Sequence, residues 1–420
     1  MFLRCYNYIE ITQLTQPTAP GSATRSKVIG MNFVNSYEVV SSWDTQTDTA
    51  TVVIPKNVVL QNSDGTAIAM QNINNNLGGD TNPLFMRGDK ITIQAGYWYT
   101  DDKGVEQQYV KLLFDGYISK VHSKLEVTLE CEDNMFLLKQ VATPDAMWGG
   151  GLSIQDILAQ CLAGSTFINN GGVIKTQSQN AVTTGIGSFY TKGETVAQLL
   201  GRLKRELSIN SYIKGDELRL DYPTYYDEDV QNVTNPYQGN SAPFKFVFQQ
   251  NIISDNLQYM RTDDMVLSAT AQSYTSGDDS DSGQTKDGQT KTRKKKLLVF
   301  VYTDPATQAL TGKQIDSTAD IPDDESGERQ NYVRTSAQSA QELINIATNE
   351  LQKTYYTGFH GSFTTFGMPF IPYGDNIALQ DKILPDRNGT YKVKGVTYTG
   401  GAGMGIRQEI FLDYKIPSQS

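Results

Sequence analysis

The chain has few of the residues on which most enzyme chemistry depends: its 420 residues include three cysteines and two histidines. Cys5, Cys131 and Cys161 are odd in number and lie far apart, which argues against a disulfide framework and excludes CxxC metal spacing. We expect all three to be small buried side chains in a reducing compartment. His122 and His360 are too few to favour a histidine-dependent mechanism. The sequence therefore predicts no catalytic, metal or cofactor site.

Long apolar runs and an excess of positive charge are also missing. No apolar stretch approaches the roughly 18–20 residues that a membrane-spanning helix needs. The first 13 residues alternate apolar and polar side chains and lack the cationic flank of a signal peptide, so we expect a strand there. The 36 basic against 46 acidic residues give a net charge of −10. This balance argues against a protein that coats nucleic acid without sequence preference, but it suits a surface past which DNA slides without binding.

What the sequence has in quantity is β structure with turns, since 23 tyrosines and 36 glycines accompany many Thr, Val, Gln and Asn residues. Apolar and polar residues alternate over residues 50–54, 91–95 and 125–132, which predicts antiparallel strands with one solvated face. Over residues 148–220 the apolar spacing becomes partly helical, with a capping-box pattern at Ser153. We therefore expect a mainly β fold with an α+β insertion.

The pattern divides the chain into three parts. Residues 1–145 are predicted to form a first tube-like β-barrel, and residues 146–235 a small α/β insertion domain with a linker. Residues 236–420 are predicted to form a second tube-like β-barrel that contains one long helix, residues 335–355, and a mobile polar loop, residues 276–296. Most of the loop consists of Gly, Ser, Asp, Thr, Gln and Lys, so it can bury little apolar area.

An internal repeat predicts that the two β-barrel modules are similar antiparallel structures separated by the small α/β domain. Residues 85–94 match residues 371–380 in a Gly-Asp-x-Ile-x-aliphatic-Gln pattern. A Gly-Asp pair makes a tight turn, and the alternation after it sets the register of a strand, so residues 91–94 and 377–380 are predicted to be equivalent strands. The structural repeat turns are assigned to Gly88, Asp89, Gly116 and Tyr117 in the first copy and to Gly374, Asp375, Gly389 and Tyr391 in the second.

The order of these motifs resembles the tail hub proteins of long-tailed bacteriophages. The motifs are the Gly-Asp-x-Ile strand, a strand over residues 114–118, an alternating strand that closes at residues 131–135, and a short helix. The α/β insertion, the long helix and the second Gly-Asp motif follow in the family's order, so the resemblance covers the whole chain. The family includes the phage late-control hub proteins and the hub part of type VI secretion spike proteins.

The resemblance implies a structural protein without enzyme activity, located in the virion tail and assembled in the host cytoplasm. A hub of this family is a homotrimer whose six β modules dock on a six-fold tail tube and present a three-fold platform to a tip or spike. Its implied partners are the tail tube protein, the tail-tip or spike protein, other baseplate proteins and a tape-measure protein, while DNA crosses the lumen without specific binding. A cell-wall-degrading activity is expected on another chain.

Two other classes of protein remain as alternatives. A carboxylate-dependent glycoside hydrolase needs a pair of acids, and its candidates are Glu130, Glu132 and Asp133. Glu130 and Glu132 project from one strand face, as solvated residues do, which favours a structural role. A receptor- or carbohydrate-binding tail protein would also be rich in strands, but it would display clustered aromatic residues. The three tryptophans are dispersed, which favours the hub: Trp43, Trp98 and Trp148.

Two further motifs have plain structural interpretations. The glycine-rich residues 400–405 resemble a phosphate-binding loop, but no helix follows them, so we expect a hairpin turn. The basic residues 293–296 suit contact with DNA or an acidic partner, but a solvated loop beside the acidic residues 278–281 is the preferred interpretation. We predict a lumen lined by neutral polar and acidic side chains, with residues 293–296 pointing away from it.

Overall fold

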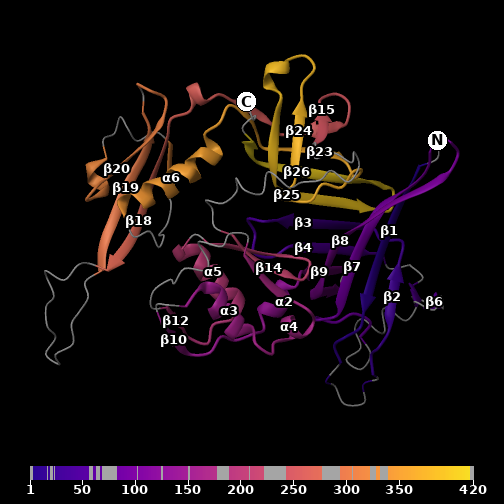
Figure 1. Ribbon diagram of the computed structural model, residues 1–420. Helices are drawn as coiled ribbons and strands as arrows, with labels where there is room; N and C mark the ends of the chain where they lie inside the picture. Colours follow the sequence, from indigo (N-terminus) through magenta and orange to yellow (C-terminus); the bar gives the residue numbers. More distant parts are fainter. Residues whose placement is uncertain are drawn as a thin grey trace.

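The computed structural model describes residues 3–16, 18, 22, 24–55, 60–62, 67–68, 83–101, 103–123, 126–149, 152–176, 189–207, 209–221, 243–276, 294–304, 306–321, 328–331 and 339–416. Over these residues the protein is mainly β, with one large sheet and two helix-bearing units (Figure 1). This confirms the predicted fold class. Within the described ranges no helix is both long and apolar enough to cross a membrane.

The first module consists of strands whose side chains alternate between a buried and a solvated face, as predicted. In β4 (Thr49–Ile54), for example, Ala50, Val52 and Ile54 are buried and the residues between them are not. The other strands are β1 (Leu3–Thr12), β2 (Val28–Met31), β3 (Ser36–Ser42), β5 (Leu60–Asn62), β6 (Ala67–Ile68), β7 (Lys90–Thr100), β8 (Glu106–Ser123) and β9 (Val127–Glu132).

The second module repeats part of this arrangement at the end of the chain. Three consecutive antiparallel strands, β24–β25–β26, have the same connection order as β7–β8–β9. Gly401 pairs with Met404 across the β25–β26 turn, so the hairpin predicted at residues 400–405 is confirmed. The strands are β15 (Phe244–Val247), β16 (Ile252–Asp255), β23 (Ser362–Phe366), β24 (Asn376–Gln380), β25 (Gly389–Gly401) and β26 (Met404–Ile416), with the 3₁₀ turn η7 (Pro385–Arg387).

The two modules are joined edge to edge in one open sheet, so the prediction of two separate closed barrels is wrong. Strand β25 pairs with β3 from Gly395↔Ser42 to Gly400↔Tyr37. The sheet order is β16-β23-β26-β25-β3-β4-β9-β8-β7-β1-β2-β5-β6, and β15 and β24 branch from β25. As edge strands, β3 and β25 would each present unpaired N–H and C=O groups, and pairing them with one another satisfies both edges.

A single apolar core serves both modules, because the curved sheet brings its two halves against each other. Buried side chains from β1, β7 and β9 belong to the same cluster as those from β25 and β26. The Tyr97 hydroxyl donates a hydrogen bond to the Ile406 carbonyl at 3.2 Å, and the ring of Tyr109 stacks on that of Phe370 with centroids 5.7 Å apart. The two copies are therefore one packed body.

The α/β unit between the modules has its own core, to which α2 from before residue 146 also contributes. The helix that begins after Ser153 has a capping box, since the Ser153 hydroxyl accepts from the Asp156 N–H and the Asp156 carboxylate accepts from the Ser153 N–H. Its elements are α2 (Met135–Leu138), β10 (Ala146–Trp148), α3 (Ile154–Leu162), α4 (Thr166–Asn169), β11 (Val173–Thr176), β12 (Phe189–Thr191), α5 (Val196–Leu207), β13 (Asn210–Lys214) and β14 (Glu217–Asp221).

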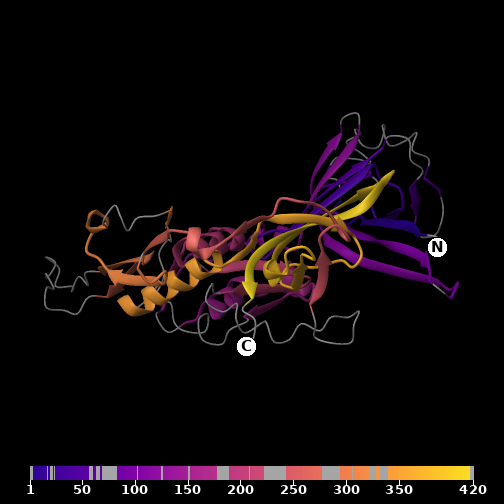
Figure 2. The ribbon, with the colours of Figure 1, turned by 90° about the horizontal axis from the view of Figure 1, so that it is seen from above.

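A second helix-bearing unit interrupts the second module, which the sequence analysis did not predict. A four-stranded sheet, β20-β19-β18-β21, packs one face on α6, and the two-stranded pair β17–β22 connects the unit to the body. It projects at the opposite end of the molecule from β1 and β2 (Figure 2). Its elements are β17 (Gln258–Met260), η4 (Thr262–Asp264), β18 (Leu267–Ser276), β19 (Lys294–Thr303), β20 (Leu310–Gln314), η5 (Thr318–Asp320), β21 (Glu328–Asn331), α6 (Ala340–Thr354) and β22 (Gly358–His360).

The predicted polar loop, residues 276–296, is described only at its two ends. Ser276 is the last residue of β18, and Lys294 is the first residue of β19. Residues 277–293, with Arg293 and the acidic residues 278–281, lie outside the described residues. Three of the four basic residues are thus in a strand instead of a loop, because they continue the antiparallel pairing of β19 with β18.

Candidate functional site

The two Gly-Asp turns have the same backbone geometry. Gly88 has φ of 91° and Gly374 has φ of 84°, a left-handed conformation that glycine adopts without strain. In the first copy Gly88 N–H donates to Ile118 O at 2.8 Å, and Ile118 N–H donates to Asp89 O at 2.9 Å. In the second, Gly374 N–H donates to Val393 O at 2.8 Å, and Val393 N–H donates to Asp375 O at 2.9 Å. This identity of bonding supports duplication.

The hydrogen bonds also correct the alignment of the second half of the repeat by two residues. Because Ile118 corresponds to Val393, the partner of Ile91 in the first copy is Gly116, whereas the partner of Ile377 in the second copy is Tyr391. Gly389, which the sequence alignment set against Gly116, instead begins β25. Glycine is needed at Gly116 because a Cβ there would lie 2.2 Å from the Glu132 carbonyl oxygen.

The two tyrosines assigned to the repeat turns are structural. The Tyr117 ring is buried and stacks on Phe136 with centroids 5.4 Å apart, which attaches the first module to α2. Tyr391 is fully buried, and its hydroxyl accepts a hydrogen bond from the Phe359 N–H at 2.9 Å. Within each copy the turn and the facing strand lie together, as the backbone bonds require.

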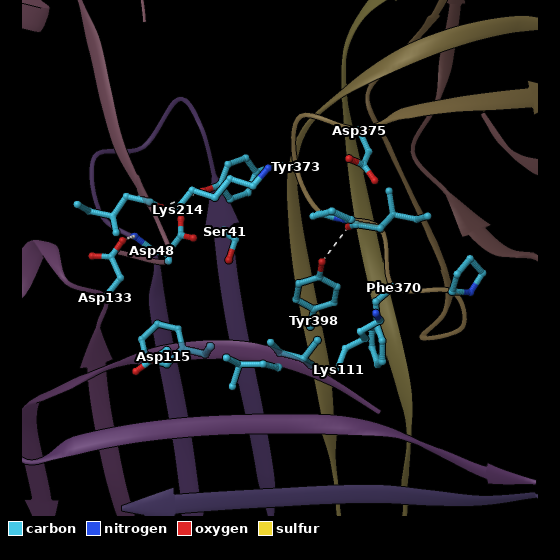
Figure 3. A pocket seen from close by; sticks show the side chains of 18 of the residues that line it. Ser41, Asp48, Lys111, Asp115, Asp133, Lys214, Phe370, Tyr373, Asp375 and Tyr398 are labelled. Carbon is cyan, nitrogen blue, oxygen red and sulfur yellow. Dashed lines mark hydrogen bonds between the residues drawn. The ribbon is translucent and has the colours of Figure 1, made fainter. Parts of the chain in front are cut away.

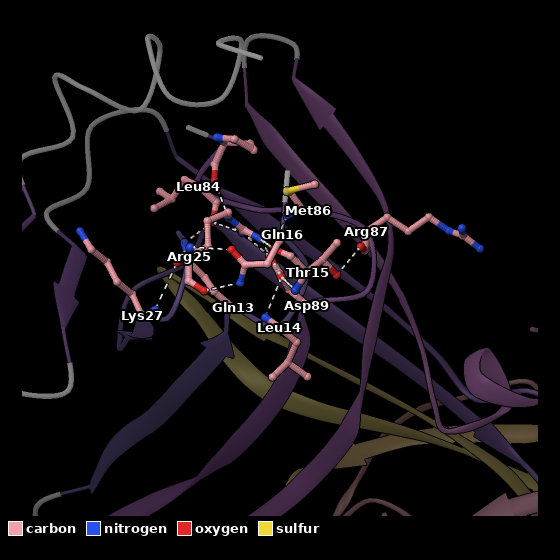
Figure 4. Close-up of polar contacts among 11 residues, drawn as sticks. Gln13, Leu14, Thr15, Gln16, Arg25, Lys27, Leu84, Met86, Arg87 and Asp89 are labelled. Carbon is pink, nitrogen blue, oxygen red and sulfur yellow. Dashed lines mark hydrogen bonds and ion pairs between the residues drawn. The ribbon is translucent and has the colours of Figure 1, made fainter. Parts of the chain in front are cut away.

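Asp89 of the first turn lies in a buried ion pair that the sequence analysis missed. The Arg25 guanidinium donates to both carboxylate oxygens, at 3.0 and 2.5 Å, and neither side chain is appreciably exposed (Figure 4). Asp89 also accepts the N–H groups of Leu14, Thr15 and Met86. The remaining Arg25 donors bind the carbonyls of Pro83, Leu84 and Thr15. The two buried charges therefore have each other as counter-ions and hydrogen-bond partners for their remaining groups, which a buried ion pair requires.

Asp375 of the second turn occupies a different environment. Burial raises its pKa above the usual range, against the opposing effect of Lys214 and Lys392. It lines a cavity of about 570 Å³ between the first module, the α/β unit and the second module (Figure 3). The apolar part of the wall includes Leu112, Phe114, Ile213, Phe244, Phe370 and Ile371.

The same cavity is lined by a pair of aspartates, Asp48 and Asp133, that hold two backbone segments together. The Asp48 N–H donates to the Asp133 carboxylate at 3.0 Å, and the Asp133 N–H donates to the Asp48 carbonyl at 3.1 Å. Burial raises the pKa of Asp48 to about 7, although hydrogen bonds from Ser42 and Ser41 oppose the change. Burial and the Asp48 charge raise the pKa of Asp133 well above its usual range.

A polar face runs across both modules on the side of the sheet opposite the core. One row of cross-strand neighbours is Lys120, Glu130, Thr51, Glu38, Thr399, Arg407 and Phe366, from β8 through β9, β4, β3, β25 and β26 to β23. The adjacent row is Glu132, Thr49, Val40, Thr397, Glu409 and Thr364. All thirteen side chains are exposed or half-buried. These two rows, called the polar face below, contain four acidic and two basic residues.

The acidic residues considered for hydrolase chemistry each contact other residues. Glu130 on the polar face contacts His122 at 2.7 Å and Lys120 at 3.2 Å, and Glu132 contacts Lys139 at 2.7 Å. Asp133 faces Asp48 instead, which the sequence analysis missed because Asp48 is one of many polar residues in the β3–β4 turn. These contacts place Glu130 and Glu132 in surface ion pairs, as their strand pattern predicted.

The histidine, cysteine and tryptophan side chains differ in how far they are buried. His360 stacks on Tyr356 with ring centroids 4.1 Å apart, and burial lowers its pKa. Cys131 and Cys161 are buried as predicted, but Cys5 is exposed, because it lies in the part of β1 beyond the core. Trp43 and Trp148 are buried, whereas Trp98 is 42% exposed.

Known structures resemble the chain over nearly its whole length. A tail protein from Neisseria meningitidis MC58 has a TM-score of 0.53 at 13% identity, with 97% of this chain and 96% of that chain covered. The 43 kDa tail protein of prophage MuSo2 from Shewanella oneidensis has a TM-score of 0.53 at 9% identity, with 97% of each chain covered. The lidded Francisella PdpA-VgrG complex has a TM-score of 0.51 at 9% identity, covering 99% of this chain and 55% of that chain.

Comparison of the sequence alone is less informative, since no protein-family model matches it and no curated protein is similar to it. At identities of 9–13% the structural likeness concerns the fold. It agrees with the resemblance read from the repeated Gly-Asp motifs and from the order of the elements between them. The protein therefore has the fold of these bacterial and prophage tail proteins and of the matched part of the Francisella PdpA-VgrG complex.

Proposed function

We propose that the protein is a structural tail hub that assembles as a homotrimer, adapts a six-fold tail tube to a three-fold tip or spike, and lets DNA pass. The observation that carries the proposal is the continuity of the polar face through both modules. Two copies of one β module in each chain give six modules in a trimer, which matches six-fold and three-fold symmetry at once. The fold shared with phage tail proteins supports the tail as its location.

In this proposal the polar face lines the lumen. Its thirteen residues include four carboxylates against Lys120 and Arg407, and most of the others are threonines. A wall with a small negative charge lowers the affinity for a phosphate backbone, so DNA slides past it. We place β19, and with it Lys294–Lys296, away from the lumen, because the unit that carries β19 projects from the body.

The partners and the location follow from the same proposal. The tail tube protein, a tip or spike protein, other baseplate proteins and the tape-measure protein are the partners in the virion tail, with assembly in the host cytoplasm. The VgrG complex among the similar structures supports a spike-like partner. The structural role needs no cofactor and no catalytic residue.

The molar mass in solution tests the assembly. We expect light scattering on the purified protein to give three times 46.5 kDa, because trimerisation closes the ring. A matched pair of variants checks the surface involved: Ile253→Glu at the exposed sheet edge β16 is expected to lower the mass, and Ile383→Glu beyond β24 is expected to leave it unchanged. A strictly monomeric protein at high concentration, with tube protein present, would contradict the proposal.

Binding of DNA tests the electrostatics of the polar face. We expect no sub-micromolar binding of a 12-base-pair duplex at physiological salt. The double variant Glu38→Lys with Thr49→Lys is expected to bind the duplex at least about tenfold more tightly, since each added cation releases counterions from DNA. The control is Thr307→Lys with Asp386→Lys, two exposed positions outside the face. Equal gains in both variants would show that the polar face does not line the path of DNA.

A carbohydrate- or receptor-binding tail protein is the second candidate function, and the exposure of Trp98 favours it. The Trp98 ring is 42% exposed and stacks on Tyr6 with centroids 6.2 Å apart. Flat aromatic rings on a strand surface suit both sugars and protein partners. A monomer that binds polysaccharide and loses binding with Trp98→Ala would support this function over the hub.

A further inference from the structure

The cavity at the junction of the three parts of the chain has a composition that selects one kind of ligand. Its volume of about 570 Å³ lies within the range typical of ligand sites, about 300–1,000 Å³. Four aspartates and two lysines, Lys111 and Lys214, line it. Asp115 is paired with Lys90 at 3.2 Å, and burial raises the pKa of Asp48 and Asp133. Asp375 forms no ion pair among the described residues, and this carboxyl in an apolar wall complements a cation on an apolar stem.

The polar groups of the cavity are mainly hydrogen-bond acceptors. The hydroxyls of Tyr373 and Tyr398 already donate to backbone carbonyls, those of Ile213 and Ile371, at 2.9 and 2.8 Å. The buried side-chain oxygen of Asn376, which also lines the cavity, has no hydrogen-bond partner among the described residues. A ligand that fits these groups must therefore donate hydrogen bonds, because acceptors in a ligand would find few donors there.

The aromatic residues favour a planar cation over a compact one. Phe244, Phe370 and Tyr398 line the same cavity as Asp375. A guanidinium stacks on aromatic rings and donates up to five hydrogen bonds in one plane, whereas an ammonium is a strongly hydrated point charge. The two lysines are exposed residues of the wall, and each lies over a tyrosine ring, Tyr109 or Tyr373. The charge of Lys214, with that of Lys392, acts to lower the pKa of Asp375 against the effect of burial, and so favours its carboxylate form.

We propose that this cavity binds an arginine side chain of a partner protein, with the guanidinium at Asp375 and Asn376 and the aliphatic stem along Phe370 and Leu112. The proposal does not depend on the tail role, since it rests on the cavity alone. It gives a function to the divergence of the two turns: Asp89 binds Arg25 of its own chain, and Asp375 takes an arginine from outside.

The test uses a peptide probe and its neutral analogue. We expect acetyl-Phe-Arg-amide to bind the full-length protein in calorimetry, and acetyl-Phe-citrulline-amide, which has the same shape without the charge, to bind at least tenfold more weakly. Asp375→Asn is expected to weaken binding of the arginine peptide at least tenfold. Leu112→Trp is expected to abolish it by filling the cavity, and as Leu112 is 56% exposed, this variant should keep its fold.

The matched control is Asp386→Asn, an exposed aspartate of the same module outside the cavity, which is expected to leave affinity unchanged. Equal affinity for the arginine and citrulline peptides would overturn the proposal. So would binding that neither Asp375→Asn nor Leu112→Trp alters. Binding of the disaccharide chitobiose in place of the peptide would also overturn it, because the cavity would then take a neutral donor.

Discussion

Replacing Arg25 with Met is expected to destabilise the first module by about 3–5 kcal/mol, the largest effect we predict for a single substitution. The change leaves the fully buried Asp89 carboxylate without its counter-ion and frees the three carbonyls that Arg25 holds. Hydrogen exchange of the amides of β7 measures the effect. Their exchange should become roughly two to four orders of magnitude faster, because about 1.4 kcal/mol corresponds to a factor of ten.

Lys394→Met is the matched control for this prediction. Lys394 lies 3.1 Å from Asp44, but both side chains are about two-fifths exposed, and exposed pairs contribute about 0–1 kcal/mol. A similar change in exchange rate for both variants would mean that the buried Arg25–Asp89 pair stabilises the protein no more than the exposed Lys394–Asp44 pair does. A variant of Arg25 that exchanges like the wild type would show that Asp89 is satisfied by its backbone partners alone.

Asp48→Asn is expected to stabilise the protein at pH 8 by about 2–4 kcal/mol and to change little at pH 4. The folded-state pKa of Asp48 is about 7, above the value of 3.8 in the unfolded chain. The folded state therefore holds a proton that the unfolded chain releases between these values. This contribution to stability is complete below pH 3.8 and is lost as the pH rises through 7. Asparagine cannot ionise, so its stability does not fall in this way.

The groups that face Asp48 act in the same direction or are neutral in this range. Burial and the Asp48 charge raise the pKa of Asp133, and burial raises the pKa of the Tyr373 and Tyr398 hydroxyls, which therefore remain protonated. Urea unfolding at pH 4 and pH 8 measures the difference. Asp44→Asn is the control of opposite sign: burial acts to raise the pKa of Asp44, but Lys394 and Lys204 lower it overall, so this variant should lose stability at pH 8. If the two variants changed stability equally between pH 4 and pH 8, the raised pKa of Asp48 would be contradicted.

Much of the fold was predictable because local patterns determine it. Alternation over residues 50–54 and 91–95, the capping box at Ser153 and the glycine-rich hairpin depend on neighbours a few residues away. The Gly-Asp repeat was visible because a left-handed turn restricts the residue that can occupy it. These local features therefore indicate the mainly β class and the family resemblance from the sequence alone.

The rest depends on contacts between residues far apart in the sequence. Arg25 and Asp89 are 64 residues apart, and nothing in the local sequence distinguishes Arg25 from a surface arginine. The β25–β3 pairing, which replaces two barrels by one sheet, involves edge strands that alternate like any others. The unit of β18 to α6 was assigned to the second barrel, although residues 297–301 of β19 form a continuous apolar run that is buried on both faces, unlike a strand with one solvated face. The cavity escaped prediction because all three parts of the chain contribute to its wall.

The pairing of β3 with β25 has a consequence for synthesis of the chain on the ribosome. Ser42 and its partner Lys394 are 352 residues apart, so at about 5–20 residues per second the edge of β3 waits roughly 20–70 s for its neighbour. During that time the nascent first module presents a free strand edge, to which another nascent chain can pair. Glu38, whose charge projects from this strand, opposes such pairing between two copies. Translation speed and chain crowding therefore bear on the yield of this fold as directly as the stability of the finished protein.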